Sequence, residues 1–201
     1  MLSIIKEQLQ EYIPSIIGVK QSYAVLLPLI EVNGELHILY EVRASHISQP
    51  GDVAFPGGKI ELGETSAEAA LRETEEELGI PTNNIQLLGE MDQIISGSHL
   101  IQCFVGKISL TEEQDYTLNE EVARIFTQPL HYFQTHPPQY HELVMAPTLE
   151  DDFPYHLIQG GKDYSFRKHT RRIPFYQLDE HQTVLWGFTA ELTQRFIELV
   201  T

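Results

Sequence analysis

A Gly-rich turn followed directly by a short, acidic helix constrains this chain more than any other feature. Residues 56–58 read Pro-Gly-Gly, and Thr65 with Glu68 three residues later forms the capping-box pattern that begins a helix. Gly79, followed shortly by a proline, is the expected helix stop. The sequence therefore predicts a loop, a helix and a second loop over residues 58–80. Two successive glycines allow the backbone of the first loop to approach an ion or a phosphate closely.

Three glutamates share one face of this predicted helix. At about 100° per residue, Glu73, Glu76 and Glu77 lie together, beside a predicted core face made of Ala67, Leu71, Thr74 and Leu78. Like charges at this spacing repel. Their simplest compensation is a hard divalent cation, because Mg²⁺ and Mn²⁺ prefer carboxylate oxygen and water. A solvated acidic face paired with Arg72 is the alternative, and the helix alone does not decide between them.

The turn and the helix together follow one fixed pattern. It is G-x5-E-x7-R-E-U-x-E-E-x-G-U, where U is a bulky apolar residue, and it is matched by Gly58, Glu64, Arg72, Glu73, Glu76, Glu77 and Gly79. Ile80 fills the last apolar position, whereas Thr74 replaces an apolar residue. Residues 58–80 thus resemble the Nudix box. The resemblance implies an α+β Nudix fold, in which a mixed β-sheet is sandwiched between α-helices.

The resemblance also implies a metal site and a class of reaction. Mg²⁺ or Mn²⁺ would be held by the carbonyl of Gly58 and by the carboxylates of Glu73, Glu76 and Glu77. Arg72 would orient these carboxylates, while Glu64 would be structural. The substrate class is a nucleoside diphosphate linked to another group, which metal-activated water cleaves at the diphosphate. Divalent ions lower the pKa of bound water and neutralise phosphoryl charge, so the donor chemistry agrees.

The stretch before the box narrows the expected substrate. Arg43-Ala44 leads through Gly51 to Phe55-Pro56-Gly57-Gly58, which resembles the second signature of the coenzyme A pyrophosphatase branch. The loop is one residue short, Ser48 replaces a basic residue, and Leu39-Tyr40-Glu41 replaces Leu-Leu-Thr. Residues 120–122, 129–130 and 186–190 are also similar to that branch. Arg43, Gly57 and Gly58 are the expected substrate-binding residues.

The resemblance implies hydrolysis of coenzyme A or acyl-coenzyme A to 3′,5′-ADP and (acyl-)4′-phosphopantetheine. A pyrophosphatase for ADP-ribose, dinucleotides or nucleoside triphosphates is one alternative, and a non-catalytic Nudix-fold nucleotide-binding protein is another. Glu121, or Glu120, is a candidate general base, although an acidic pair at a helix start explains both residues equally well. Five basic residues in 162–172 fit a phosphate site, an exposed hairpin or a dimer contact.

Hydrophobic patterning predicts a single domain over residues 1–201, with an N-terminal helical extension in 1–20. The amphipathic helix of that extension covers 2–11, and its apolar side carries Leu2, Ile5 and Leu9. A C-terminal helix is expected over 184–200. Asn33-Gly34 predicts a hairpin. Pro28 predicts that the first strand is weakened in its middle, or that this residue lies at an edge or a bulge. Strands are predicted over 22–32, 35–43, 53–55, 85–92, 100–109, 140–145, 154–158 and 172–178, while 120–126 stays ambiguous.

Charge and cysteine content limit the partners. The formal net charge of −16 argues against nucleic acid and anionic membranes as partners. The Nudix resemblance implies a small nucleotide as the ligand. The longest apolar run covers seven residues, far too few to span a membrane. Cys103 is the one cysteine, so no internal disulfide forms, and we expect this thiol in the core. The sequence predicts a cytoplasmic protein, and the Nudix resemblance adds a possible homodimer.

Overall fold

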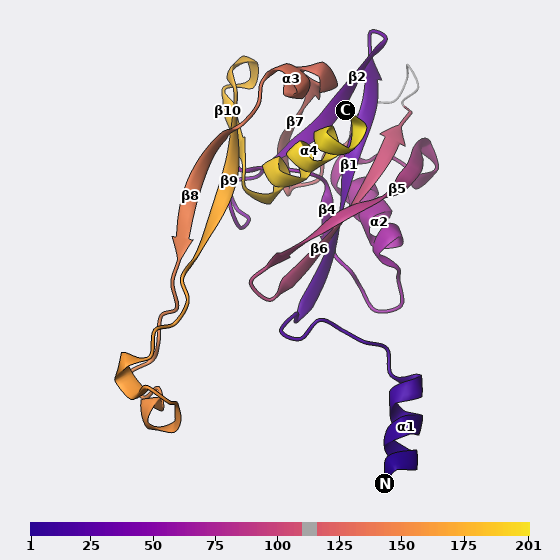
Figure 1. Cartoon of the computed structure of the whole chain (residues 1–201). Coiled ribbons are helices and arrows are strands. Elements are labelled where there is room, and N and C mark those ends of the chain that lie inside the picture. The colour runs from indigo at the N-terminus through magenta and orange to yellow at the C-terminus, as the bar shows by residue number, and fades with distance from the viewer. Residues whose placement is uncertain (110–115) are drawn as a thin grey trace.

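A computed structural model of the chain describes residues 1–109 and 116–201 (Figure 1). Its centre is a seven-stranded mixed sheet. The long strand β1 (Gln21–Val32) pairs in parallel with β6 (His99–Ile108) and antiparallel with β2 (Glu35–Arg43). The remaining strands of this sheet are β3 (Val53–Ala54), β4 (Gly57–Lys59), β5 (Ile85–Ser96) and β7 (Val122–Pro129).

Helices cover both faces of the central sheet. On one face, α2 (Ser66–Leu78) buries Ala69, Ala70 and Leu78 against apolar residues of β1, β2 and β6. On the other face, α3 (Leu130–Thr135) and α4 (Gly187–Val200) pack into a second apolar cluster, which also contains Cys103. This arrangement confirms the predicted α+β sandwich and the buried position of Cys103.

A smaller three-stranded sheet has the order β10-β9-β8. Its strands are β8 (Gln139–Met145), β9 (His169–Leu178) and β10 (Thr183–Trp186). Near its end, β9 contributes Tyr176 and Leu178 to the core, whereas every residue of β8 is exposed. Figure 1 shows β8 and β9 extending away from the sandwich as an arm, with η2 (Tyr155–Leu157) and η3 (Gly161–Asp163) near its tip.

Pro28 occupies the middle of β1 although β1 is an internal strand. On one side β1 pairs with β4 through residues 23–25 and with β2 through residues 29–32, so Pro28 falls in the gap between these two ladders. A residue without an N–H costs no hydrogen bond in such a gap. Pro28 therefore lies neither at an edge nor at a bulge, and that alternative was wrong, whereas the weakened pairing expected in the middle of the strand is present on this side of β1.

Two predicted elements differ from the structure. Residues 154–158 form no strand: the short 3-10 helix η2 lies there, within the arm. The C-terminal helix begins at Gly187 and not at Val184, because residues 183–186 pair with β9 as β10. The ambiguous segment 120–126 enters β7, and the hairpin at Asn33-Gly34 is confirmed between β1 and β2.

The N-terminal helix forms where it was predicted, as α1 (Leu2–Glu11), but it buries no residue. Figure 1 shows it separated from the sandwich by the chain that leads into β1. Two further 3-10 turns are η1 (Thr82–Asn84) and η4 (Asp179–His181). Across residues 1–109 and 116–201, no helix combines the length and the apolar character that crossing a membrane requires.

Candidate active site

Helix α2 is fixed at both ends by the contacts that its sequence predicts. The Thr65 hydroxyl accepts a hydrogen bond from the Glu68 N–H at 3.2 Å, and the Glu68 carboxylate accepts one from the Thr65 N–H at 2.7 Å. Gly79 is left-handed, with φ +69°, and donates its N–H to the Glu75 carbonyl at 2.9 Å. Capping of this kind holds the helix start and end in place, and so it fixes the direction of the acidic face.

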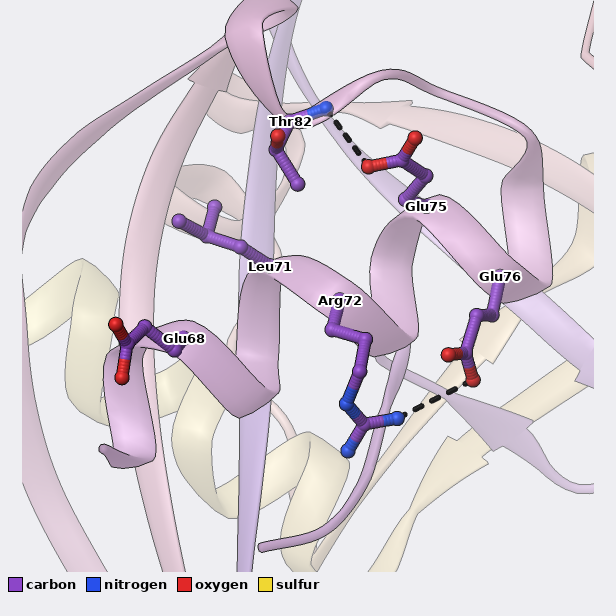
Figure 2. Close-up of a pocket in the computed structure, with 6 residues that line it drawn as sticks. All are labelled: Glu68, Leu71, Arg72, Glu75, Glu76 and Thr82. Carbon is purple, nitrogen blue, oxygen red and sulfur yellow. Dashed lines mark hydrogen bonds and ion pairs between the residues drawn. The ribbon is translucent and has the colours of Figure 1, made fainter. Parts of the chain in front are cut away.

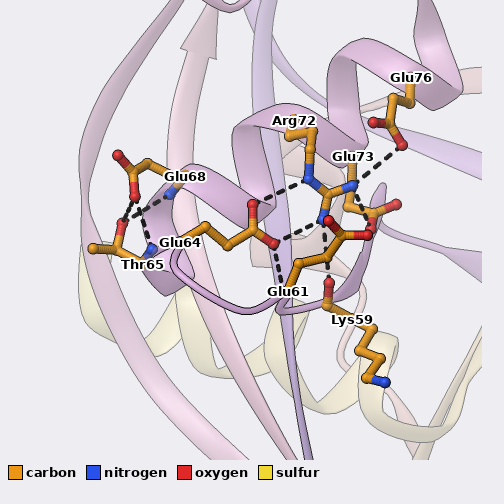
Figure 3. A network of polar contacts seen from close by, with 8 residues as sticks. All are labelled: Lys59, Glu61, Glu64, Thr65, Glu68, Arg72, Glu73 and Glu76. Atoms are coloured by element: carbon orange, nitrogen blue, oxygen red, sulfur yellow. Dashed lines mark hydrogen bonds and ion pairs between the residues drawn. The ribbon is translucent and has the colours of Figure 1, made fainter.

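The guanidinium of Arg72 gathers three box carboxylates (Figure 3). It binds Glu64 through Nε at 3.1 Å and Nη2 at 2.9 Å, which lowers the pKa of Glu64. Its Nη1 lies 2.9 Å from Glu73 and 3.2 Å from Glu76. Arg72 therefore contacts two of the three carboxylates that it was expected to orient, Glu73 and Glu76, whereas Glu77 binds Gly57. The orienting role of Arg72 and the structural role of Glu64 stay predictions.

Glu77 points inward, and only 4% of its surface is exposed. Its Oε2 accepts the backbone N–H of Gly57 at 2.8 Å. Burial and the neighbouring carboxylate of Glu41 raise the pKa of Glu77 to about 9. The ionised form of a carboxylate is unfavourable at this buried position, so a bound cation or protonation of the side chain would stabilise the site.

The two glycines of the turn make these close approaches possible. A Cβ on Gly57 would lie 2.4 Å from the Ala24 carbonyl oxygen, because β4 pairs tightly with β1 there. A Cβ on Gly58 would lie 2.3 Å from the Glu73 carboxyl carbon. The backbone at Gly58 thus lies directly against a box carboxylate, as the predicted metal site requires.

A cleft of about 770 Å³ brings most of the predicted site residues together. Its walls include six of them: Arg43, Gly57, Gly58, Glu73, Glu77 and Glu121. Arg72 and Glu76 instead line a separate pocket of about 430 Å³ on α2, where Figure 2 shows the two side chains paired. Glu76 is half-exposed at 55%, and its predicted role as a metal ligand stays a prediction.

Glu121 reaches the cleft on a segment that is anchored to α2. The N–H of Asn119 donates to the Glu77 carbonyl at 3.0 Å, and the Asn119 side chain accepts the N–H of Glu121 at 2.9 Å. The Glu121 carbonyl in turn accepts the N–H of Ala44 at 2.8 Å. Glu120 and Glu121 precede strand β7, so the alternative that they begin a helix was wrong.

Arg43 closes the loop that precedes the box. Its Nε donates to the Ser48 carbonyl at 2.9 Å, and its own carbonyl accepts the N–H of Gly51 at 3.0 Å. Ser48, which stands where the coenzyme A signature has a basic residue, is therefore a partner of Arg43 at the cleft wall. The shortened loop is compact and keeps Arg43 beside the cleft.

Glu41 is a site residue that the sequence did not single out. It lies on β2, is 2% exposed, and its Oε2 has no hydrogen-bond partner among the described residues. Burial raises its pKa to about 7, and repulsion from Glu121 and Glu73 adds to that effect. Neighbouring strand residues point to opposite faces, so Glu41 lies opposite Tyr40, but the sequence could not show that α2 covers the face of Glu41.

Arg171 and Trp186 also line the cleft. Arg171 belongs to the basic cluster for which a phosphate site was one of the predictions, whereas Trp186 was not predicted there. Arg171 pairs with Glu191 at 2.7 and 3.1 Å. Trp186 stacks on Phe175, with ring centroids 5.7 Å apart, and donates its indole N–H to Asp52 at 3.3 Å. The similarity of residues 186–190 to the coenzyme A branch was the available signal for Trp186.

The basic residues in 162–172 do not act together. Arg171 faces the cleft, whereas the Arg172 guanidinium lies 4.3 Å from the centre of the Tyr140 ring. Lys162, Arg167 and Lys168 are exposed on the arm. An exposed hairpin therefore describes the cluster better than a joint phosphate site.

The box carboxylates are donors that a hard divalent cation prefers. Their side chains, however, are not oriented toward one common point where an ion could bind. Among the described residues, no group of three or more His, Cys, Asp or Glu side chains is arranged to hold a metal ion. Glu73 and Glu76 bind Arg72, and Glu77 binds Gly57. The unpartnered, buried oxygen of Glu41 nevertheless shows that acceptor capacity remains unused beside Glu77. Carboxylate oxygens are the donors that Mg²⁺ and Mn²⁺ prefer.

Comparison with known proteins agrees with the box and the fold. The family model described as NUDIX domain matches residues 20–149. The chain belongs to the Nudix hydrolase family. The peroxisomal coenzyme A diphosphatase of Mus musculus is 31% identical over 75% of this chain and 66% of its own length. The mitochondrial coenzyme A diphosphatase of Homo sapiens is 30% identical over 89% of this chain and 69% of its own length.

Other Nudix relatives differ in length or in sequence. Nudix hydrolase 3 of Caenorhabditis elegans is 36% identical over 53% of this chain, and the match spans only 47% of that protein. Among solved structures, the MutT/nudix family protein from Enterococcus faecalis superposes with a TM-score of 0.52. It is 15% identical, over 100% of this chain and 69% of that one, and so supports the fold alone.

Proposed function

We propose that this Nudix protein hydrolyses the diphosphate of coenzyme A or acyl-coenzyme A, giving 3′,5′-ADP and (acyl-)4′-phosphopantetheine. One observation carries the proposal: a single cleft joins box carboxylates to cationic side chains and to an exposed tryptophan face. Relatives named as coenzyme A diphosphatases at about 30% identity support the substrate class.

The box residues would hold the cation that the reaction needs. Mg²⁺ or Mn²⁺ would be bound by Glu73, Glu76, Glu77 and the Gly58 carbonyl, with Arg72 orienting the first two carboxylates. A bound divalent ion lowers the pKa of water and neutralises charge that develops on phosphoryl oxygens. Glu121, which lines the same cleft, would accept the proton of the attacking water.

The cations in the cleft fit a substrate with separated phosphates. Coenzyme A carries a 3′-phosphate besides its diphosphate, and Arg43, Lys59 and Arg171 all line the cleft. Guanidinium groups suit bidentate phosphate contacts. Trp186 is 40% exposed, and its ring offers a flat surface on which an adenine base can stack.

Two alternative functions can be tested in one experiment. An ADP-ribose, dinucleotide or nucleoside triphosphate pyrophosphatase would use the same carboxylates but would not require a site for a 3′-phosphate. A non-catalytic nucleotide-binding protein receives no support from the relatives, which are named as hydrolases. The cytoplasmic location, the homodimer and the single domain over residues 1–201 stay predictions.

The test is product analysis with Mg²⁺ or Mn²⁺ and a substrate panel. The panel holds coenzyme A, 3′-dephospho-coenzyme A, ADP-ribose, NADH and a nucleoside triphosphate. We expect 3′,5′-ADP from coenzyme A to form fastest. Glu77→Gln should lower this rate about 1,000-fold, because several kcal/mol of charge stabilisation depend on the metal.

The matched control is Glu75→Gln, the same chemical change at an exposed position of α2. It should retain activity within about twofold, since surface substitutions away from a site have small effects. Faster turnover of ADP-ribose or NADH would overturn the coenzyme A assignment and leave the catalytic helix in place. Binding without turnover of any substrate on the panel would favour the non-catalytic alternative.

A further inference from the structure

Glu41 is a buried carboxylate that folding alone does not explain. It lies on β2 between Ala54 of β3 and Ile125 of β7, and is 2% exposed. Leu39, two residues earlier on the same face, packs in the apolar cluster of α2. An ionised carboxylate in such a place is strongly destabilising unless another group compensates its charge.

The groups facing Glu41 are mostly of the same charge. Glu73 and Glu77 face it from α2, Glu121 faces it from the segment before β7, and Arg43 follows it on β2. Arg43 already donates through its Nε to the Ser48 carbonyl. Arg72 neutralises part of the charge of Glu73 through its contact at 2.9 Å, but the Oε2 of Glu41 accepts no hydrogen bond from any described residue.

We propose that Glu41 is a further carboxylate of the cation site and binds a hard divalent ion, Mg²⁺ or Mn²⁺, together with Glu77. Glu77 lines the cleft, so the site lies at the part of the cleft wall that Glu77 forms. Both residues are more than nine-tenths buried, and their negative charges repel each other. A divalent ion between them removes this repulsion and supplies the missing partner of Oε2. This inference rests on the proposed metal-dependent function.

The test measures cation binding directly, without substrate. Mn²⁺ affinity of the full-length protein is determined by calorimetry and by electron paramagnetic resonance of the free ion. Glu41→Gln keeps the shape of the side chain and removes its charge. We expect its Mn²⁺ affinity to fall about 10-fold or more, the range found when groups that support a metal site are lost. Glu75→Gln is the matched control and should bind Mn²⁺ as the wild type does.

The outcomes separate this inference from the proposed function. If wild-type protein binds Mn²⁺ and Glu41→Gln binds it equally well, Glu41 is not a ligand and the inference is overturned. If the wild type binds no Mn²⁺, the metal-dependent function itself fails. If the wild type binds Mn²⁺ but does not cleave coenzyme A, only the substrate assignment fails.

A second variant guards against loss of structure. Glu41→Met fills the same space without a polar group, and replacing a buried charge by an apolar residue is often neutral or stabilising. We expect it to fold, to unfold at the same or a higher temperature than the wild type without cation, and to show the same loss of Mn²⁺ affinity. Wild-type Mn²⁺ affinity in folded Glu41→Met would equally overturn the inference.

Discussion

Helices α1 and α2 carry comparable amphipathic patterns, but the fold uses them in opposite ways. Helix α2 has 13 residues, and five of them are buried. Helix α1 has 10 residues and buries none, although Leu2, Ile5 and Leu9 lie on one side of it. The difference shows that an amphipathic pattern indicates which face a helix can bury. Whether that face is buried depends on a second surface that packs against it.

The two helices also differ in their ends. Helix α2 begins with a complete capping box and ends at left-handed Gly79, whereas the N-cap of α1 makes no side-chain hydrogen bond. In α2, therefore, a helix with capped ends is also packed against the sheet. In α1, an amphipathic sequence forms a helix that has neither a side-chain cap nor a packing partner among the described residues. The agreement of capping and packing in α2 is typical of a segment that must hold its side chains in fixed positions.

The largest loss of stability is expected from a substitution that opens a cavity under the buried face of α2. Leu78 is fully buried between α2 and the sheet. Leu78→Ala should lower the free energy of unfolding by about 2–5 kcal/mol, because it removes apolar contacts and leaves a cavity. Urea unfolding followed by circular dichroism measures this change. A loss below about 1 kcal/mol would mean that α2 contributes little to the stability of the sandwich.

A smaller effect is expected at the start of α2. Thr65→Ala removes the side-chain half of the capping box and should cost about 1 kcal/mol. Ser66→Ala, one residue inside the same helix, is the control and should change stability by less than about 0.5 kcal/mol. Thermal unfolding of both variants under one buffer condition separates the two values. Equal effects would show that the cap does not stabilise the protein.

The smallest effect is expected in α1. Leu9 is 66% exposed, so Leu9→Ala should change the free energy of unfolding by less than about 0.5 kcal/mol. Urea unfolding at two protein concentrations measures it. A loss above about 1 kcal/mol that depends on concentration would show that a second copy covers α1 and would support the expected homodimer.

Much of the candidate site follows from short-range patterns. The box spacing placed Gly58 against Glu73 and brought Glu64, Glu73 and Glu76 to Arg72, because these residues lie on one helix or on the loop just before it. The hairpin at Asn33-Gly34 and the caps of α2 are equally local. Each depends on hydrogen bonds over a few residues, which composition and spacing predict well.

The parts that were missed depend on contacts between distant segments. Glu41 was not singled out in the sequence, because its burial depends on α2 covering that face of β2. Trp186 reaches the cleft because β10, which pairs with β9, also contacts β3. Neither strand carries a pattern that says which other strands it will meet.

The sequence by itself determined the acidic helix, its caps, the glycine turn and the family. Tertiary structure alone decided that Glu41 is buried and interacts with Glu77, that Glu121 and Arg171 share one cleft, and that α1 stays uncovered. The physical reason is the sequence separation of the residues that interact. Capping and turn geometry are satisfied within a few residues, whereas burial of a side chain depends on whichever distant surface the folded chain brings against it.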